Sequence, residues 1–499
     1  MIVQKIKIQN FSNEQKLLTI IIVATSIRLI FGLSGLGMDE TYTVATSRHL
    51  SLSYFDHPPM AWWLSGVMQW LTHSEATIIV RLPFILISAL SIWRMYLLTQ
   101  VLFGEAAALF ASFVFSVAPV LGMTSATWVL PDGPLIFALL TAAYYLARLF
   151  FDVKPDPRLW LAAGFWGGIA MVSKYHGIFL FAGAGLFIVT SPLQSHWLRR
   201  PWPYLGAGLG LLIFSPVIIW NVDHHWISFS FQSGRTGVPE IHLLKPFVTL
   251  AGNALFLFPW IWLGSVAATL IALKSRVTHP QRWLMLCLGL PLVVLFLCIS
   301  ALSSTHVFYH WSMPGYLLLI PLLGEWISQK FEQYPLSFKC LGVLSVSIVF
   351  IIVTGVMVFW SFPSVFSYIG LRTDPIQDMR DFANIGTYIE DSGLADQRGL
   401  IVAPTKWFMA GKFDYALNGR FLVTCLCADA RQYGVDAPLD QLVGRNFLIP
   451  VAAADVKNED HFLSDHFEHV DRLDNLHITS HGQKIEEFYM FYGKNFHIN

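Results

Sequence analysis

The sequence LLTIIIVATSIRLIFGLSGLGMDE, residues 17–40, joins an apolar run directly to the acidic pair Asp39-Glu40. The apolar part, residues 17–36, has the length of roughly 20 residues that an α-helix needs to cross a bilayer. A cleavable secretion signal has a shorter apolar core, so we expect an uncleaved first membrane helix. The acidic pair then lies at one mouth of this helix, in a chain with few charges.

The composition of the whole chain agrees with a membrane protein. Of its 499 residues, 55% are hydrophobic and 13% are charged, whereas soluble domains carry roughly 25% charged residues. Residues 370–499 hold 12 Lys and Arg against 19 Asp and Glu, whereas residues 1–369 hold 20 against 13. We therefore predict a polytopic α-helical transmembrane domain over residues 1–369 and a small soluble α/β domain over residues 370–499.

Apolar runs of suitable length recur along the first 369 residues. We predict eleven to thirteen transmembrane helices, two of them as split helices, with spans near residues 17–36, 76–99, 106–121, 131–150, 159–173, 177–191, 203–221, 246–272, 283–301, 310–327 and 340–361. With the N-terminus inside, the outer loops hold only four Lys and Arg, which are Arg48, Lys174, Arg235 and Lys245. The positive-inside rule thus places the loop 37–75 and the C-terminal domain outside the cytoplasm.

The C-terminal domain is predicted to alternate helices and strands. Helices are expected over 376–391 and 406–417, with Gly419 as a stop, and strands over 399–403, 421–425, 446–451 and 486–492. Cys425 and Cys427 would point to the same side of an extended strand, where a disulfide between them would be strained, so we expect none. Cys287, Cys298 and Cys340 lie in or beside apolar runs and are expected to pack as small hydrophobic residues.

Glycines inside the predicted spans are typical of close helix packing in membranes. No G-x-G-x-x-G follows a predicted strand, and no G-x-x-x-x-G-K-[ST] occurs. We therefore expect no nucleotide cofactor.

The loop 37–75 is predicted to form two short helices at the membrane interface. One covers residues 38–50 from the acidic pair onward, and the other covers 58–72, where Pro58-Pro59 suit a first helical turn. Trp62, Trp63 and Trp70 give the second helix an aromatic face of the kind found at lipid interfaces. Asp56 and His57 precede this helix, so the polar residues of the loop are expected at headgroup depth.

The order of motifs resembles the GT-C membrane glycosyltransferases, in the branch of protein O-mannosyltransferases, lipid A aminoarabinose transferases and galacturonosyltransferases. The matching residues are Asp39-Glu40, Tyr54-Phe55-Asp56-His57-Pro58-Pro59, Arg81-Leu82-Pro83, Asp132-Gly133-Pro134-Leu135, Ser173-Lys174-Tyr175, Trp220-Asn221, His225 to Phe229, and His310 to Pro314. The resemblance is strong over residues 20–240 and weaker to 361. In that family many members carry a variable extracytoplasmic C-terminal domain.

The resemblance implies transfer of a sugar from a polyprenyl-phosphate donor to a lipid or glycan acceptor outside the cytoplasm. Lipid A or lipopolysaccharide core at a bacterial inner membrane is the acceptor that the branch suggests, and no nucleic acid partner is expected. Asp39 matches the position of the family's catalytic acid and is predicted to be the general base, with Glu40 as its catalytic neighbour. The residues predicted to bind the donor and its phosphate are Lys174, Tyr175, Asp56, His57, Asp132 and Arg235.

Several alternatives stay open at the level of sequence. The family often has Glu-Lys where this chain has Asp56-His57, and Asp56, His57 and one of His224 or His225 could instead hold a divalent metal. Asp39, Glu40, Asp56 and Asp132 could also cap helices. A lipid flippase or transporter, or a non-catalytic scaffold, are the alternative functions, although no internal repeat of the kind common in transporters is visible.

Overall fold

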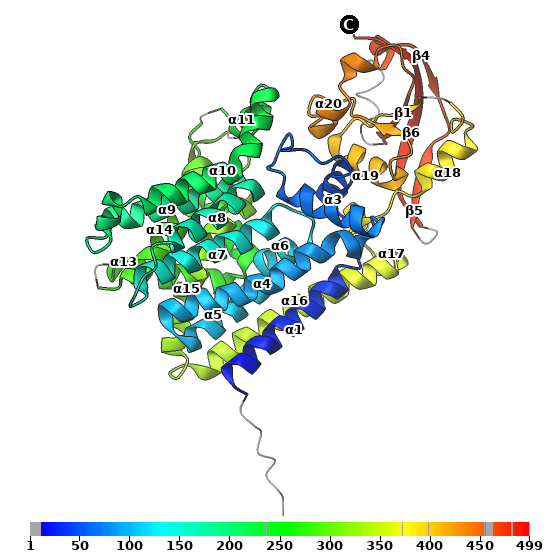
Figure 1. Cartoon of the computed structure of the whole chain (residues 1–499). Coiled ribbons are helices and arrows are strands. Elements are labelled where there is room, and N and C mark those ends of the chain that lie inside the picture. The colour runs from blue at the N-terminus through cyan, green and yellow to red at the C-terminus, as the bar shows by residue number, and fades with distance from the viewer. Residues whose placement is uncertain are drawn as a thin grey trace, which may run out of the picture.

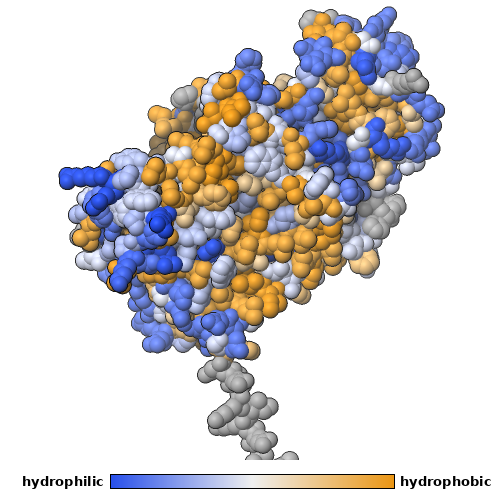
Figure 2. All heavy atoms as spheres, viewed as in Figure 1, coloured by the Kyte–Doolittle hydropathy of each residue, from blue (hydrophilic) through white to orange (hydrophobic). Residues whose placement is uncertain are grey.

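The computed structural model describes residues 11–498, apart from residues 236, 239, 277, 372, 398, 454, 456–462 and 481–482. Figure 1 shows a helical bundle with the C-terminal part seated on one end of it. On the face in Figure 2, apolar residues cover much of the side of the bundle. The predicted architecture, a helical membrane protein with a small C-terminal sheet domain, is confirmed, whereas the domain boundary at residue 370 stays a prediction.

The first half of the bundle contains the loop with the acidic pair. Ser12 caps the first helix by accepting from the Gln15 backbone N–H, and the Gln15 side chain accepts from the Ser12 backbone in return. The elements are α1 (Asn13–Phe31), α2 (Met38–Thr46), α3 (Met60–Thr72), α4 (Thr77–Phe103), α5 (Glu105–Val117), the π-helix η1 (Pro119–Thr124), α6 (Ser125–Thr127), α7 (Asp132–Phe151), α8 (Leu159–Ser173), η2 (Tyr175–Gly177), α9 (Ile178–Thr190) and η3 (Ser195–Arg199).

The second half of the bundle runs to residue 368. Its elements are α10 (Trp202–Asp223), α11 (Ile227–Gly234), α12 (Lys245–Leu257), α13 (Pro259–Lys274), α14 (Pro280–Leu302), η4 (Tyr309–Ser312), α15 (Met313–Lys330), α16 (Pro335–Ser361) and α17 (Ser364–Tyr368). Glycines bring helices close together, because a Cβ on Gly164 would lie 2.0 Å from the carbonyl oxygen of Gly206.

Each predicted span coincides with a helix or a bent pair of helices. Among the described residues, five helices are long and apolar enough to cross a membrane, which are α4, α7, α10, α14 and α16. The number rises to seven when two bent pairs are each counted as one span. The predicted span 246–272 is one such pair, since the chain turns by 113° between α12 and α13, at Phe258 with φ of 72°. The other predicted spans fall on helices that are shorter or carry more polar residues.

The C-terminal part is built around a six-stranded sheet. Its elements are η5 (Gln377–Met379), α18 (Asn384–Asp391), β1 (Ile401–Val402), α19 (Trp407–Leu417), β2 (Leu422–Val423), α20 (Gln432–Asp436), η6 (Leu439–Leu442), β3 (Phe447–Ala452), β4 (Phe467–Arg472), β5 (Leu476–Ser480) and β6 (Gln483–Phe496). Strand β1 pairs in parallel with β2 and β3, and β6 pairs antiparallel with β3, β4 and β5.

The expectation for the two cysteines of the C-terminal part was wrong. Cys425 and Cys427 form a disulfide. Strand β2 ends at Val423, so both cysteines lie in the loop that follows it. The prediction assumed an extended strand, on which two cysteines two residues apart could not easily form a disulfide.

One hydrophobic core joins the loop 37–75 to the C-terminal part. Buried residues from the loop, such as Tyr42, Tyr54 and Trp62, belong to the same cluster as Phe413 and Phe488. Helix α19 packs along α2. The loop is therefore enclosed between the bundle and the C-terminal part, and this placement determines the surroundings of the acidic pair.

Candidate active site

Glu40 is held by a buried ion pair with Arg81. The Arg81 guanidinium donates to both carboxylate oxygens of Glu40, at 2.8 and 2.5 Å, and the two side chains are 0% and 1% exposed. Glu40 also accepts from the backbone N–H groups of Gly37 and Val129, each at 3.0 Å. Both carboxylate oxygens are thus occupied, and Glu40 fixes the first turn of α2 against α4 and the segment before α7.

Arg81 extends this clamp to the end of α1. Its guanidinium donates to the carbonyl oxygens of Gly32, Ser34 and Gly35, at 3.2, 2.7 and 2.8 Å. These carbonyls belong to the turn that links α1 to α2. A planar, always charged guanidinium can hold a carboxylate and several carbonyls at once, which a lysine could not do in the same geometry. The acidic pair therefore begins α2 at a rigidly fixed position.

Asp39, the other member of the pair, is available for chemistry. Its side chain is exposed, and among the described residues its carboxylate makes no hydrogen bond and no ion pair. Although water reaches it, the surrounding protein displaces much of the solvent, and this desolvation raises the pKa of Asp39 above its usual value. Arg431 and Arg235 lower this pKa, whereas Asp56 and Glu40 raise it. A carboxylate with a raised pKa is a better base than an ordinary aspartate.

Asp56 lies in the same polar cluster as Asp39. Its carboxylate accepts from the Tyr42 hydroxyl at 3.2 Å and pairs with Arg431 at 3.1 Å. Its backbone oxygen accepts from the Gln232 side chain at 2.5 Å, which ties the loop to α11. Burial raises the pKa of Asp56, and Arg431 lowers it. The pairing shows that this carboxylate has a cationic partner from the C-terminal part.

His57 differs from the fixed cation that the family often has at this position. Burial lowers the pKa of His57 well below its usual value, and Lys174 and Arg235 lower it further. Its Nδ1 is buried and has no hydrogen-bond partner among the residues that the structure describes. A neutral imidazole can donate one hydrogen bond but supplies no positive charge.

Lys174 and Asp132 form a second ion pair near His57. The Lys174 Nζ lies 2.9 and 3.0 Å from the two carboxylate oxygens of Asp132, and Lys174 is 4% exposed. The positive charge of Lys174 is therefore largely balanced inside the protein. Tyr175, the next residue, packs its ring against Phe214 and Phe229, at centroid distances of 6.4 and 5.3 Å.

Arg235 is the cation among the predicted site residues that lacks a carboxylate partner. Among the described residues its guanidinium makes no ion pair, and it lies over the ring of Trp311 at 4.6 Å and of Phe231 at 5.6 Å. Arg48, by contrast, pairs with Glu75 and Asp414, each at 2.6 Å. Aromatic faces stabilise a guanidinium without neutralising it, so Arg235 can still bind an anion.

The four candidate metal ligands do not come together. The ring of His224 stacks on Trp220 at 3.9 Å, and its Nδ1 contacts the Trp220 backbone oxygen at 2.8 Å. His225 is exposed. Among the described residues, no group of three or more His, Cys, Asp and Glu is arranged to hold a metal ion. The donor set formed by Asp56, His57, His224 and His225 therefore does not fit a divalent metal, and no step of the chemistry is assigned to one.

Two contributions to the site were not predicted from the sequence. Arg81 belongs to one of the sequence motifs named above, but its contact with Glu40 can be seen only in the folded chain. Arg431 lies 375 residues from Asp56 in the chain, and nothing in its local sequence indicates a site residue. Both arginines act through contacts that only the folded chain creates.

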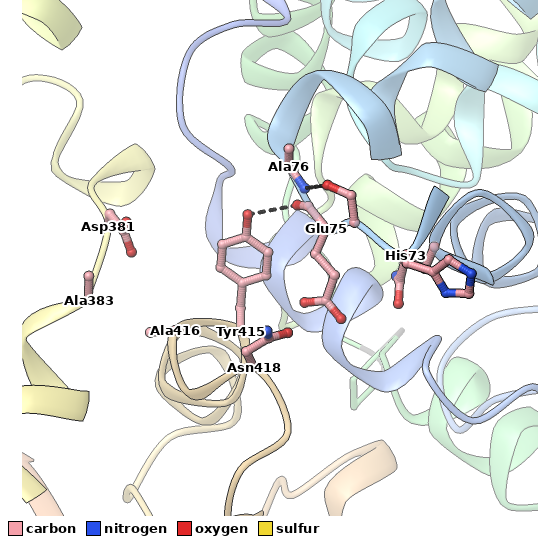
Figure 3. Close-up of a pocket in the computed structure, with 10 residues that line it drawn as sticks. His73, Glu75, Ala76, Asp381, Ala383, Tyr415, Ala416 and Asn418 are labelled. Atoms are coloured by element: carbon pink, nitrogen blue, oxygen red, sulfur yellow. Dashed lines mark hydrogen bonds between the residues drawn. The ribbon is translucent and has the colours of Figure 1, made fainter. Parts of the chain in front are cut away.

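A polar recess opens where the loop meets the C-terminal part (Figure 3), and its lining contains none of the predicted catalytic or donor-binding residues. Its cavity volume is about 460 Å³, and its lining includes His73, Glu75, Asp381 and Asn418. Figure 3 shows Tyr415 directed toward the loop, and its hydroxyl donates to the backbone oxygen of Glu75 at 2.9 Å. This bond is one of several that hold the C-terminal part on the loop.

The chain is similar to known proteins in part of its sequence and in its fold. Residues 56–220 match the sequence model of the family described as dolichyl-phosphate-mannose-protein mannosyltransferase. Two crystal structures of ArnT from Cupriavidus metallidurans are similar in fold, one bound to undecaprenyl phosphate and one in the apo state. Their TM-scores are 0.62 and 0.64, each at 13% identity, covering 95% of this chain and 97% of ArnT. No curated protein matched the sequence.

Proposed function

We propose that the chain is a membrane glycosyltransferase of the GT-C type, which moves a sugar from a polyprenyl-phosphate donor to a hydroxyl of an extracytoplasmic acceptor. The match of residues 56–220 to the mannosyltransferase family model and the likeness of the fold to ArnT support this proposal. The observation that carries the proposal is the environment of Asp39. Its carboxylate is unpaired among the described residues, has a raised pKa, and lies where Arg235 and Arg431 act on its charge. A base beside cations suits a reaction that removes a proton and expels a phosphate.

The reaction exchanges one bond to the sugar for another. The bond between the anomeric carbon and the phosphate oxygen breaks, and a bond to the acceptor oxygen forms. Asp39 accepts the proton of the acceptor hydroxyl, so that the attacking oxygen gains negative charge as it approaches. Negative charge grows on the departing phosphate at the same time, and Arg235 is the cation assigned to it. The donor carries its own leaving group, so no nucleotide is required.

The remaining predicted site residues are assigned to supporting Asp39 and Arg235. The pair of Lys174 and Asp132 is assigned to the donor side of the site, where it brings a hydrogen-bonding surface with little net charge. The unpartnered Nδ1 of His57 is assigned to a hydrogen bond with the donor. Tyr175 is assigned to the wall of the donor site. Glu40, which is saturated with hydrogen bonds, is assigned to positioning Asp39 and not to proton transfer.

A lipid-anchored acceptor, such as lipid A or the lipopolysaccharide core, suits the position of the site. Helix α3 leaves Val67, Trp70 and Leu71 exposed, with Trp70 72% accessible. Exposed Trp and aliphatic residues on a short helix are typical of an element lying in the membrane interface. The acceptor would then reach Asp39 from the outer leaflet of a bacterial inner membrane, with the C-terminal part on the same side.

The test is transfer by the purified full chain in lipid vesicles. A polyprenyl-phosphate donor with a radiolabelled sugar is supplied together with lipid A, a core glycolipid or an unfolded protein as acceptor. We expect label in one of the lipid acceptors and release of polyprenyl phosphate. Movement of the labelled donor across the bilayer without a new glycosidic bond would instead identify a flippase. Mass spectrometry of lipid A, core oligosaccharide and glycoproteins from cells with and without the protein identifies the acceptor.

The activity is expected to rise with pH through the pKa of Asp39. The base works only when deprotonated, and desolvation by the surrounding protein raises the pKa of Asp39, so the acidic limb of the kcat/KM profile should lie above the ordinary aspartate value of about 3.9. Arg235 lowers this pKa, so Arg235→Gln should move the limb to higher pH. A limb at or below the ordinary value, or one that Arg235→Gln leaves in place, would contradict the assignment of Asp39.

A further inference from the structure

Arg431, from the loop before α20, reaches across to the candidate active site. Its Nη1 lies 3.1 Å from Oδ2 of Asp56. Its guanidinium lies 3.4 Å from the centroid of the Trp407 ring, at the start of α19. The C-terminal part thus supplies both the cation and the aromatic platform on which this cation rests.

The backbone at Arg431 is strained. Its φ of 48° and ψ of −130° fall in a region that residues with a Cβ rarely adopt. Such strain persists only where surrounding contacts enforce it. Here the contacts come from Gln432, whose backbone N–H donates to the Tyr42 hydroxyl at 3.2 Å and whose side chain accepts from Phe55 N–H at 2.9 Å. The loop 37–75 therefore holds Arg431 in an orientation that the chain would not adopt alone.

Arg431 and Arg235 approach the same aromatic ring. Each guanidinium carbon lies 5.6 Å from the centroid of Phe231. The charges are close enough that Arg431 lowers the pKa of Arg235, after burial as the larger cause. The Nε of Arg431 is buried and makes no hydrogen bond among the described residues, since the nearest carboxylate oxygen, of Asp429, lies 3.6 Å away in a long ion pair. Two like charges held together, one with an unused buried donor, form an arrangement that an anion would stabilise.

We propose that Arg431 and Arg235 together bind the phosphate of the lipid-linked donor, so that the C-terminal part completes the donor site. This inference rests on the proposed function and adds to it a residue from outside the membrane bundle. Arg431 then shares its guanidinium between Asp56 and the phosphate, and Trp407 keeps the guanidinium plane in place. Donor binding consequently depends on the docking of the C-terminal part.

Several buried contacts hold the C-terminal part on the loop 37–75 and so fix the position of Arg431. Lys412 in α19 is buried and donates to the backbone oxygens of Leu36 and Arg380, at 2.7 and 3.1 Å. Arg48 in the loop pairs with Asp414. These contacts and the shared hydrophobic core leave the position of Arg431 fixed relative to Asp56.

The experiment measures binding of undecaprenyl phosphate, as probe, to the full-length protein in detergent. Arg431→Ala is expected to weaken binding about tenfold or more, because it removes a charge-assisted hydrogen bond to the phosphate. Arg431→Lys keeps the charge and should recover part of the affinity. Arg431→Gly removes the charge and relieves the strained backbone, so it should bind as weakly as Arg431→Ala with a melting temperature no lower than that of Arg431→Ala. Arg420→Ala, on an exposed arginine paired with Glu390, is the control and should bind like the unaltered chain.

Two further arms separate the sources of the effect. Undecaprenol, with the same tail and no phosphate, should bind equally to the unaltered chain and to Arg431→Ala. Inorganic phosphate at millimolar concentration tests whether the anion alone is recognised. It should displace undecaprenyl phosphate only from the unaltered chain and from Arg431→Lys. Unchanged affinity of folded Arg431→Ala for undecaprenyl phosphate would overturn the proposal. Because this readout requires no sugar transfer, a failure of the transfer assay alone would reject the proposed reaction and leave the phosphate site standing.

Discussion

Replacing Asp39 by asparagine is expected to reduce sugar transfer by roughly 10²- to 10⁴-fold, the usual contribution of a general base. The amide is nearly the same size as the carboxylate but cannot accept the proton of the attacking hydroxyl. Since the Asp39 carboxylate makes no hydrogen bond or ion pair among the described residues, its removal breaks no contact that holds α2. The initial rate of transfer in vesicles, measured beside the melting temperature, separates loss of chemistry from loss of structure.

A matched control is available on the same chain. Asp223 ends α10 and is exposed, and Asp223→Asn should leave both the rate and the melting temperature close to those of the unaltered chain. Asp39→Asn should still bind undecaprenyl phosphate, because the base acts on the acceptor and not on the donor. Full transfer activity in a folded Asp39→Asn protein would remove Asp39 from the reaction.

Replacing Arg81 by alanine is expected to produce the largest loss of stability, about 3–5 kcal/mol in the free energy of unfolding. The substitution leaves the Glu40 carboxylate buried without its counter-charge and removes the donor to three carbonyls of the turn between α1 and α2. The measurement is thermal or denaturant unfolding in detergent, together with the yield of folded protein. Loss of activity should accompany it, since α2 carries Asp39.

The exposed pair of Arg420 and Glu390 provides the comparison for Arg81. Both side chains of that pair are more than half exposed, at 55% and 53%. Surface pairs of this kind contribute about 0–1 kcal/mol, so Arg420→Ala should hardly change the unfolding curve. An equal effect of the two substitutions would show that the buried clamp contributes no more than a surface ion pair.

Much of the bundle could be predicted because membrane helices are recognised from one-dimensional information. A sufficiently long run of apolar residues is by itself enough to predict a membrane helix, and each predicted span fell on a helix or a bent pair of helices. Bends are harder to predict, because α12 and α13 form one continuous apolar run. The chain turns at Phe258, where Pro259 begins the next helix and φ is positive. In the C-terminal part, β4 and β5 were missed because they are short and rich in polar residues, and only their pairing with β6 in the folded chain defines them as strands.

The candidate site, like the fold, could be predicted only in part from the sequence. The position of Asp39 followed from its place after the first apolar run, but the different environments of Asp39 and Glu40 did not, because adjacent residues of a helix point in different directions. Glu40 turns into the clamp with Arg81, whereas Asp39 remains accessible. The pairing of Asp56 with Arg431 depends on how two distant parts of the chain dock, which the local sequence does not encode.

The hydrophobic core shared by the loop and the C-terminal part has a consequence for biosynthesis. The loop is translated soon after the first helix, whereas its packing partners, among them Phe413, Tyr433 and Phe488, emerge near the end of the chain. During this interval Tyr42, Tyr54 and Trp62 lack the surface that buries them. The loop is thus the first segment of the candidate site to be made and among the last to be buried, so a ribosome that stops early leaves a chain with its helical bundle translated and its candidate site unformed.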